Sequence, residues 1–290
     1  MTSSRFLAWS WFAPLPAVAV GLAIALAHGV PWSAYAPNLA ALGLVAIVAA
    51  LARLRPGAGS RAIAWAPVVS SVAIACTLLA PGIDGVHRWL GLGGLRVHAS
   101  SALAPWLLVR CTSWPSWRAR LSRAALVLVQ LVHVAQPDAG QATALAIGAL
   151  PLLLAGVGVP RRVDVPLAAA LLVLAAVAWS RADPLAPVDH VERILVLAFA
   201  AGRTWTVVAA LAIAVLVLPL AIAARGHGPA AWAAVVYLLA TVAVTFLGAF
   251  PVPVLGAGAA PVLGWYALRR VGAAAVECAP HVPRTLSTDA

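Results

Sequence analysis

The chain has 290 residues, of which 63% are hydrophobic and 9% are charged, and its mean hydropathy is +0.99. This composition leaves too few polar groups to cover a water-exposed surface, so it excludes a soluble protein and indicates a polytopic membrane protein. The net charge of +11 does not indicate nucleic-acid binding. Lys is absent, and the Arg residues are scattered over the connections between apolar segments instead of forming one basic face.

A membrane-spanning helix needs about 20 mostly apolar residues. In chain order, we expect ten spans, some of them short, at Trp9–Ala27, Pro37–Leu51, Ala62–Leu79, His98–Val109, Ala124–Val134, Gln141–Val157, Val165–Trp179, Thr204–Ala223, Pro229–Phe250 and Leu255–Leu268. The apolar stretch Val191–Ala201 is too short to cross and predicts a re-entrant or interfacial helix. The expected fold is therefore an all-α transmembrane bundle, a single domain over residues 1–271, followed by a disordered cytoplasmic tail over 272–290.

The arginines give the orientation. If the amino terminus is cytoplasmic, 14 arginines fall on the cytoplasmic side, and five fall outside: Arg88, Arg96, Arg181, Arg193 and Arg203. By the positive-inside rule, this asymmetry predicts that both termini are cytoplasmic. The acids run the other way, since five of the eight lie outside: Asp84, Asp138, Asp183, Asp189 and Glu192. Acids contribute little to orientation, so their outer clustering suggests chemistry on the outer face.

Three polar runs interrupt the apolar sequence on the outer side. The connection after the third span is a run of Gly, basic and Trp residues, Gly85–Leu95, which leads into His98 and Ser100. The turn Gln136–Gly140 separates two later spans, and the segment Pro251–Gly258 precedes the last span.

These runs resemble motifs of the SEDS family (shape, elongation, division and sporulation). In the first run, six residues match the family letters: Gly85, Arg88, Trp89, Leu92, Gly93 and Ser100. Four residues depart from the family, where Gln, Pro, Glu and Lys are usual: His98, Ala99, Ser101 and Ala104. The turn Gln136–Gly140 is similar to the family's Q-P-D-x-G. Pro251–Gly258 is similar to P-x-P-F-L-S-Y-G-G, with Gly256 and Ala257 in place of the Ser and Tyr.

A fourth match, Asp183-Pro184-Leu185 followed by His190, is similar to the family's D-P-L-x-x-x-x-H/Q. In the family this motif opens a long outer loop that carries a catalytic acid. Here the whole connection from Trp179 to Thr204 is too short for such a loop.

The resemblance implies a chemistry. Family members polymerise lipid II, a disaccharide-peptide carried on undecaprenyl pyrophosphate, in cell-wall synthesis linked to shape or division in the bacterial cytoplasmic membrane. A sugar hydroxyl attacks an anomeric carbon and the lipid pyrophosphate leaves. This step needs a carboxylate to take the hydroxyl proton, and an Arg or a divalent cation to stabilise the leaving group. The implied partners are lipid II or another undecaprenyl-linked precursor, membrane lipids and a penicillin-binding protein.

The candidate bases are Glu192, ranked first, and Asp138. The candidate substrate-binding residues are Arg88, Trp89, His98, Ser100, Asp183 and His190. Several have a plain structural alternative. Asp138 could stabilise the dipole of the following helix, His98 could cap a helix, and Arg88 and Trp89 could anchor the loop at the lipid interface. No metal-ligand spacing is present.

Three functions remain open at this stage. The chain is a glycan polymerase with a reduced outer site, a non-catalytic relative that binds a lipid-linked precursor or a penicillin-binding protein, or a small-solute transporter. The transporter is disfavoured because few ionisable groups fall mid-membrane, where coupling sites usually carry them.

Overall fold

The computed structural model describes residues 9–54, 58–93, 95–109, 116–156, 159–226 and 228–277. These residues form eleven α-helices: α2 (Pro14–Ala27), α3 (Ala36–Leu54), α4 (Ala58–Cys76), α5 (Ala99–Leu103), α6 (Ser116–Ala135), α7 (Ala139–Ala155), α8 (Arg161–Trp179), α9 (Ile194–Ala200), α10 (Arg203–Ala224), α11 (Pro229–Val244) and α12 (Ala259–Glu277). Short 3-10 turns are η1 (Ser10–Phe12), η2 (Trp32–Tyr35), η3 (Thr77–Leu79) and η4 (Ala104–Leu108). One small sheet pairs β1 (Trp89–Leu92) with β2 (Leu95–His98).

The all-α bundle is confirmed, and each of the ten expected spans contains a helix. Among the described residues, four helical stretches are by themselves long and apolar enough to cross a membrane: Ser10–Ala27, Trp32–Leu54, Arg161–Trp179 and Arg203–Ala224. The predicted span His98–Val109 is the pair α5 and η4, which is too short to cross alone. The apolar stretch Val191–Ala201 contains the short helix α9. The chain is therefore a multi-pass membrane protein whose bundle mixes long and short helices.

Small residues bring the central helices together. Helix α7 packs between α8 and α11, and a Cβ added at Gly148 would lie 2.7 Å from the Cβ of Tyr237 on α11. A Cβ added at Gly264 on α12 would lie 2.0 Å from the carbonyl oxygen of Ser101 on α5. Helix association in a membrane depends on close packing because lipid provides no hydrophobic drive, so both glycines fix the interior of the bundle.

The two strands form an antiparallel hairpin in which Trp89 pairs with His98. Gly93 at its turn has φ +62°, a left-handed conformation that favours glycine. The hairpin is a correction to the expected loop. The sequence prediction missed it because β1 has no alternation of polar and apolar residues, and the alternation in β2 covers only four residues.

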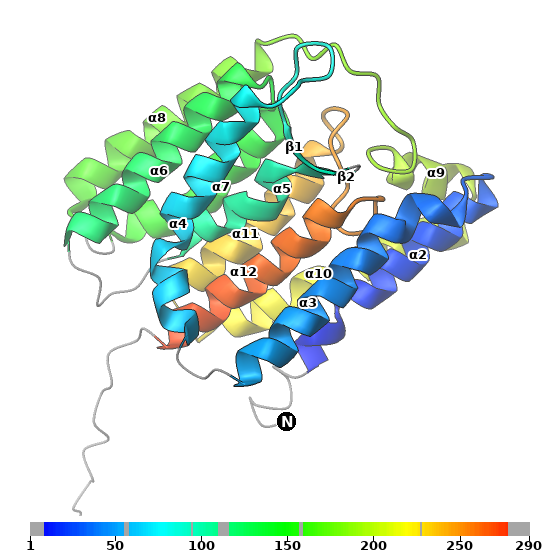
Figure 1. Cartoon of the computed structure of the whole chain (residues 1–290), viewed down its shortest axis with the longest axis horizontal. Helices are drawn as coiled ribbons and strands as arrows, with labels where there is room; N and C mark the ends of the chain where they lie inside the picture. The colour runs from blue at the N-terminus through cyan, green and yellow to red at the C-terminus, as the bar shows by residue number, and fades with distance from the viewer. Residues whose placement is uncertain are drawn as a thin grey trace, which may run out of the picture.

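The segments that carry the motifs gather at one end of the bundle (Figure 1). The hairpin, the connection from α8 to α9 and the connection from α11 to α12 lie at this end, and α12 ends at the other. Near that other end, Arg123 on α6 and Asp164 on α8 form a buried two-bond ion pair. Helix α12 continues to Glu277, past the predicted domain end at residue 271, and residues 278–290 of the predicted tail lie outside the described residues.

Candidate functional site

Arg88 joins three segments at the end of the bundle that carries the motifs. It directly precedes β1, and its side chain is buried, with an exposed fraction of 5%. Its Nε donates to the carbonyl oxygen of Gln136 (3.3 Å), and its Nη2 donates to the carbonyl oxygen of Pro137 and to the Oδ2 of Asp183 (2.7 Å). The guanidinium thus holds the hairpin, the Gln136–Gly140 turn and the loop after α8 together.

Asp183 is the partner of Arg88 and the start of a tight turn. Its side chain is 30% exposed. While Oδ2 accepts from Arg88, Oδ1 accepts from the backbone N–H of Leu185 at 3.2 Å. Both oxygens of this predicted substrate-binding residue are therefore engaged within the chain.

His98 and Asp138 each cap a helix. The Nδ1 of His98 accepts from the backbone N–H of Ser101 at 3.2 Å at the start of α5. The Oδ1 of Asp138 accepts from the backbone N–H of Gln141 at 3.2 Å at the start of α7. The structural role considered for each residue is thus present in the structure.

The same two side chains also face each other. Since Nδ1 of His98 is an acceptor, the proton of the neutral imidazole sits on Nε2, which lies 3.4 Å from the Oδ2 of Asp138. That oxygen makes no hydrogen bond with the described residues. Burial raises the pKa of Asp138, but the charge of Arg88, the electrostatic interactions with His98 and His133 and the hydrogen bond from the Gln141 N–H outweigh burial and leave the pKa below its ordinary value.

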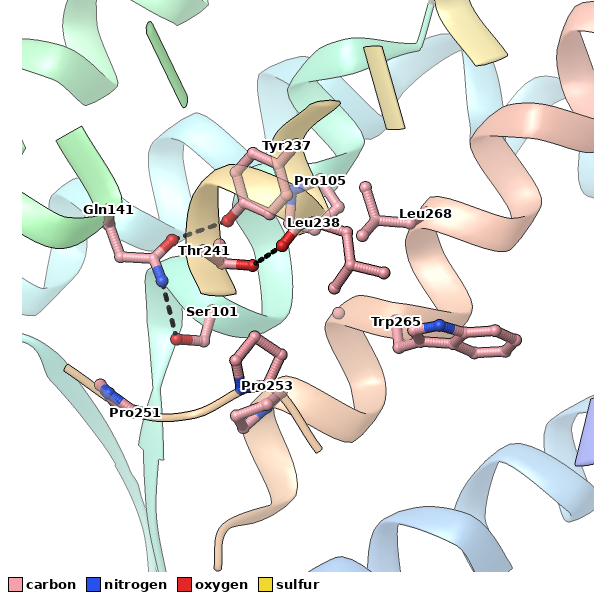
Figure 2. Close-up of a pocket in the computed structure, with 12 residues that line it drawn as sticks. Ser101, Pro105, Gln141, Tyr237, Leu238, Thr241, Pro251, Pro253, Trp265 and Leu268 are labelled. Carbon is pink, nitrogen blue, oxygen red and sulfur yellow. Dashed lines mark hydrogen bonds between the residues drawn. The ribbon is translucent and has the colours of Figure 1, made fainter. Parts of the chain in front are cut away.

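A buried polar network continues inward from this pair. The Nε2 of His133 on α6 lies 2.9 Å from the Oγ of Ser100. The side chain of Gln141 donates to the Oγ of Ser101 (3.2 Å) and accepts from the hydroxyl of Tyr237 (2.6 Å). Figure 2 shows Gln141 between these two partners, at the edge of a cavity of about 30 Å³. This volume suits one or two water molecules and is too small for a substrate.

Glu192 lies in the turn before α9 and is half-buried. Its Oε2 accepts from the backbone N–H of Val188 at 2.8 Å, and it forms no ion pair with a described residue. Burial raises the pKa of Glu192; the Val188 hydrogen bond and the Arg88 charge reduce the effect, and the charge of Asp183 adds to it. A raised pKa brings a carboxylate closer to the range in which it works as a general base.

The segment Pro251–Gly258 packs backbone to backbone against the turn that holds Glu192. The N–H of Val252 donates to the carbonyl oxygen of Val191 (3.1 Å), and the N–H of Ala257 donates to that of His190 (2.9 Å). A Cβ added at Gly256 would lie 2.2 Å from the Val191 carbonyl oxygen. The glycine at this position, where the resembling motif has Ser, is therefore required by the close approach.

Two residues that the sequence analysis missed hold this segment from the amino-terminal helices. The hydroxyl of Tyr35 donates to the carbonyl oxygen of Leu255 at 2.9 Å. The side chain of Asn38 donates to the carbonyl oxygen of Gly256 at 3.1 Å and accepts from the N–H of Gly258 at 2.6 Å. A fully buried Asn within an apolar span was the signal available in the sequence.

Two other predicted substrate-binding residues lie in the same region without ion pairs. Trp89 is half-buried, and its ring contacts that of His98 edge to face at a centroid distance of 6.0 Å. His190 is half-buried and contributes its carbonyl oxygen to Ala257. All eight predicted site residues thus lie at the same end of the bundle, on segments that contact one another.

Comparisons with known proteins identify the fold. No protein-family model and no curated protein matches the chain. Among solved structures, it is similar to the rod shape-determining protein RodA of Thermus thermophilus, with 18% identity and a TM-score of 0.63 over 92% of this chain and 95% of that chain. An aspartate-to-alanine variant of RodA gives 17% identity and a TM-score of 0.64 over 92% and 96%. The chain has a SEDS-like fold.

A third similar structure is a chain of a peptidoglycan synthase complex that coordinates polymerization and crosslinking, with 19% identity, a TM-score of 0.64, and coverage of 94% of this chain and 98% of that chain. Because nearly the whole of each chain is covered, the SEDS-like fold is present over the length of the bundle despite the short connection from Trp179 to Thr204. The described residues contain no group of three or more His, Cys, Asp or Glu that could hold a metal ion.

Proposed function

We propose that the chain is a lipid II-dependent glycan polymerase of the SEDS type, acting in peptidoglycan synthesis linked to cell shape or division. The observation that carries the proposal is the meeting of the four sequence motifs at one outer cluster on a SEDS-like fold. Arg88 joins the first, second and fourth motifs. The turn that continues the fourth is hydrogen-bonded to the third through His190 and Val191.

Glu192 is the proposed general base. A sugar hydroxyl oxygen forms a new bond to the anomeric carbon of a second unit, the bond from that carbon to the lipid diphosphate breaks, and the hydroxyl proton passes to the Glu192 carboxylate. Glu192 suits this role because it is half-buried, has no cationic partner among the described residues and has a raised pKa. The diphosphate leaves with both bonding electrons, and its charge requires an Arg or a divalent cation.

Asp138 is the second candidate base, through its Oδ2, which makes no hydrogen bond with the described residues and lies 3.4 Å from the Nε2 of His98. Its cap on α7 and its lowered pKa favour a positioning role instead. We propose that Asp138 and His98 keep the hairpin and α7 in register, while Ser100 ties α5 to α6 through His133. Trp89 and His190 would then contact the sugar, from the two sides of the cluster.

The proposed location is the bacterial cytoplasmic membrane, with both termini in the cytoplasm and the cluster outside. The 14-to-5 distribution of arginines supports this orientation. A penicillin-binding protein is the proposed partner, because the similar chain from a peptidoglycan synthase complex works where polymerization is coordinated with crosslinking.

A second candidate function is binding of the lipid-linked precursor without catalysis. It is favoured by the short connection between α8 and α10, which leaves Glu192 as the proposed base in place of a longer catalytic loop. Incubation of the purified protein in lipid nanodiscs with lipid II, Mg²⁺ and the partner separates the two. Glycan chains on a gel support the polymerase, whereas lipid II binding without glycan supports the binding protein.

A further inference from the structure

A separate cavity of about 270 Å³ lies beside the outer cluster. It is lined by Pro137, Ala139, Trp179, Arg181, Asp183, Leu185, Gly248, Ala249 and Phe250. None of Arg88, His98, Asp138 and Glu192 lines it. The cavity is therefore distinct from the proposed catalytic cluster, although Pro137 and Asp183 border both.

The cavity carries a positive charge that the chain does not neutralise. Asp183, its one lining acid, is already paired with Arg88 at 2.7 Å and bonded to the N–H of Leu185. Arg181 is exposed, and its guanidinium makes no hydrogen bond or ion pair with any described residue. An unpaired guanidinium is suited to a phosphate, because its planar fork binds two oxygens at once and stays charged.

Two aromatic side chains, Trp179 and Phe250, form part of the cavity wall. The rings of Trp179 and Phe250 meet edge to face at 5.5 Å, and the indole N–H of Trp179 donates to the Oγ1 of Thr143 at 2.9 Å. Phe246 and Leu247, just before the lining residue Gly248, are 72% and 68% exposed. A cation beside exposed apolar side chains at the outer end of a membrane bundle suits an amphiphile with an anionic head and a hydrocarbon tail.

We propose that this cavity binds the diphosphate of a second polyprenyl-linked substrate, with Arg181 as the phosphate-binding residue. The proposal rests on the proposed function, since a polymerase that joins two lipid-linked units must hold two of them at once. The volume is below the ~300–1,000 Å³ of pockets that enclose a drug-sized ligand. The cavity therefore takes the diphosphate and the first carbons of the chain, and the sugars lie outside it.

The test is binding of a polyprenyl diphosphate without sugars to the protein in nanodiscs, measured by native mass spectrometry. Arg181→Ala should weaken binding about tenfold or more, the loss expected for a hydrogen bond to a charged group. Arg181→Lys should recover part, because an ammonium lacks the fork. The matched control is Arg96→Ala, which removes another exposed outer arginine that does not line the cavity. Equal binding by Arg181→Ala and Arg96→Ala would overturn the proposal.

Two further arms make the result specific. Ala249→Trp fills the cavity without removing charge and should weaken diphosphate binding while the melting temperature is retained. If Arg181→Ala lowers the binding of phosphatidylglycerol as much as that of the diphosphate, the cavity is a general lipid-headgroup site and the proposal is wrong.

The proposed function and this inference fail separately. If the parent protein binds the diphosphate through Arg181 but makes no glycan, the proposed function is wrong and the proposed binding site stands. If the parent protein polymerises lipid II and the Arg181→Ala variant binds the diphosphate equally well, the proposed binding site is wrong and the proposed function stands.

Discussion

The Arg88 guanidinium and the Asp183 carboxylate, 95 positions apart in the chain, form an ion pair of 2.7 Å. Arg88 also donates hydrogen bonds to the carbonyl oxygens of Gln136 and Pro137, so one buried side chain connects three segments at one end of the bundle. This arrangement commits its Nε and Nη2 groups within the protein. We therefore propose Arg88 as a positioning residue, in place of the pyrophosphate-binding role that its sequence motif suggests.

Replacement of Arg88 tests this role through stability. Arg88→Ala should lower the free energy of unfolding by about 1.5–3 kcal/mol, since hydrogen bonds to a charged group are lost. Arg88→Lys should recover only part of the loss. The measurement is thermal unfolding in detergent, with the exposed Arg96→Ala as control. An Arg88→Ala variant that is as stable as the parent but binds lipid II weakly would restore the substrate-binding role.

Asp138 allows its two roles to be separated. Asp138→Ala should lower stability by about 1 kcal/mol through loss of the α7 cap. Asp138→Asn keeps an oxygen for the Gln141 N–H, so the melting temperature and most of the polymerase activity should remain. The proposed assignment of the base to Glu192 is wrong if Asp138→Asn folds normally yet loses activity a hundredfold.

Gly140 is predicted to be intolerant of a side chain. A Cβ at this position would clash with the ring of Phe250, so the ring would have to shift. Gly140→Ala should therefore destabilise the outer end of α7 by about 1–3 kcal/mol, the usual cost of overpacking. Gly43→Ala on α3 is the control, because nothing lies within 4 Å of its added Cβ. If Gly140→Ala and Gly43→Ala have the same melting temperature, this packing is contradicted.

The orientation can be measured directly. Reporter fusions at Gly57 and Ser287 should report the cytoplasm, and a fusion at Gly93 in the hairpin turn should report the outside, because of the arginine distribution. A carboxy terminus on the outside would mean an odd number of crossings and would place the cluster or the tail on the wrong side.

Much of the fold could be predicted from the sequence, because long apolar segments have few alternatives to helix in a membrane. Helices α3, α8 and α10 are read directly from their hydrophobic lengths. The end of α12 was missed because small, weakly apolar residues continue the helix to Glu277. The hairpin was missed because its two strands are only four residues long.

Less of the site could be predicted, because its contacts join distant segments. The order of the motifs identified Arg88, Asp138 and Asp183 as candidate site residues, but nothing in the sequence predicts the ion pair between Arg88 and Asp183. The network through Gln141 and Tyr237 was missed for the same reason. His133 was detectable in principle, since with Gln130 it forms a polar pair three residues apart on one face of an apolar helix.

The most direct test of the central claim is lipid II polymerisation by the purified protein and by Glu192→Gln, each with lipid II binding measured in parallel. The parent should make glycan, and Glu192→Gln should bind lipid II equally but lose activity about a hundredfold or more. Because the pKa of Glu192 is raised, the parent's activity should fall with decreasing pH already above the ordinary value of 4.5. A parent protein that binds lipid II but makes no glycan with Mg²⁺ and its partner present would contradict the account.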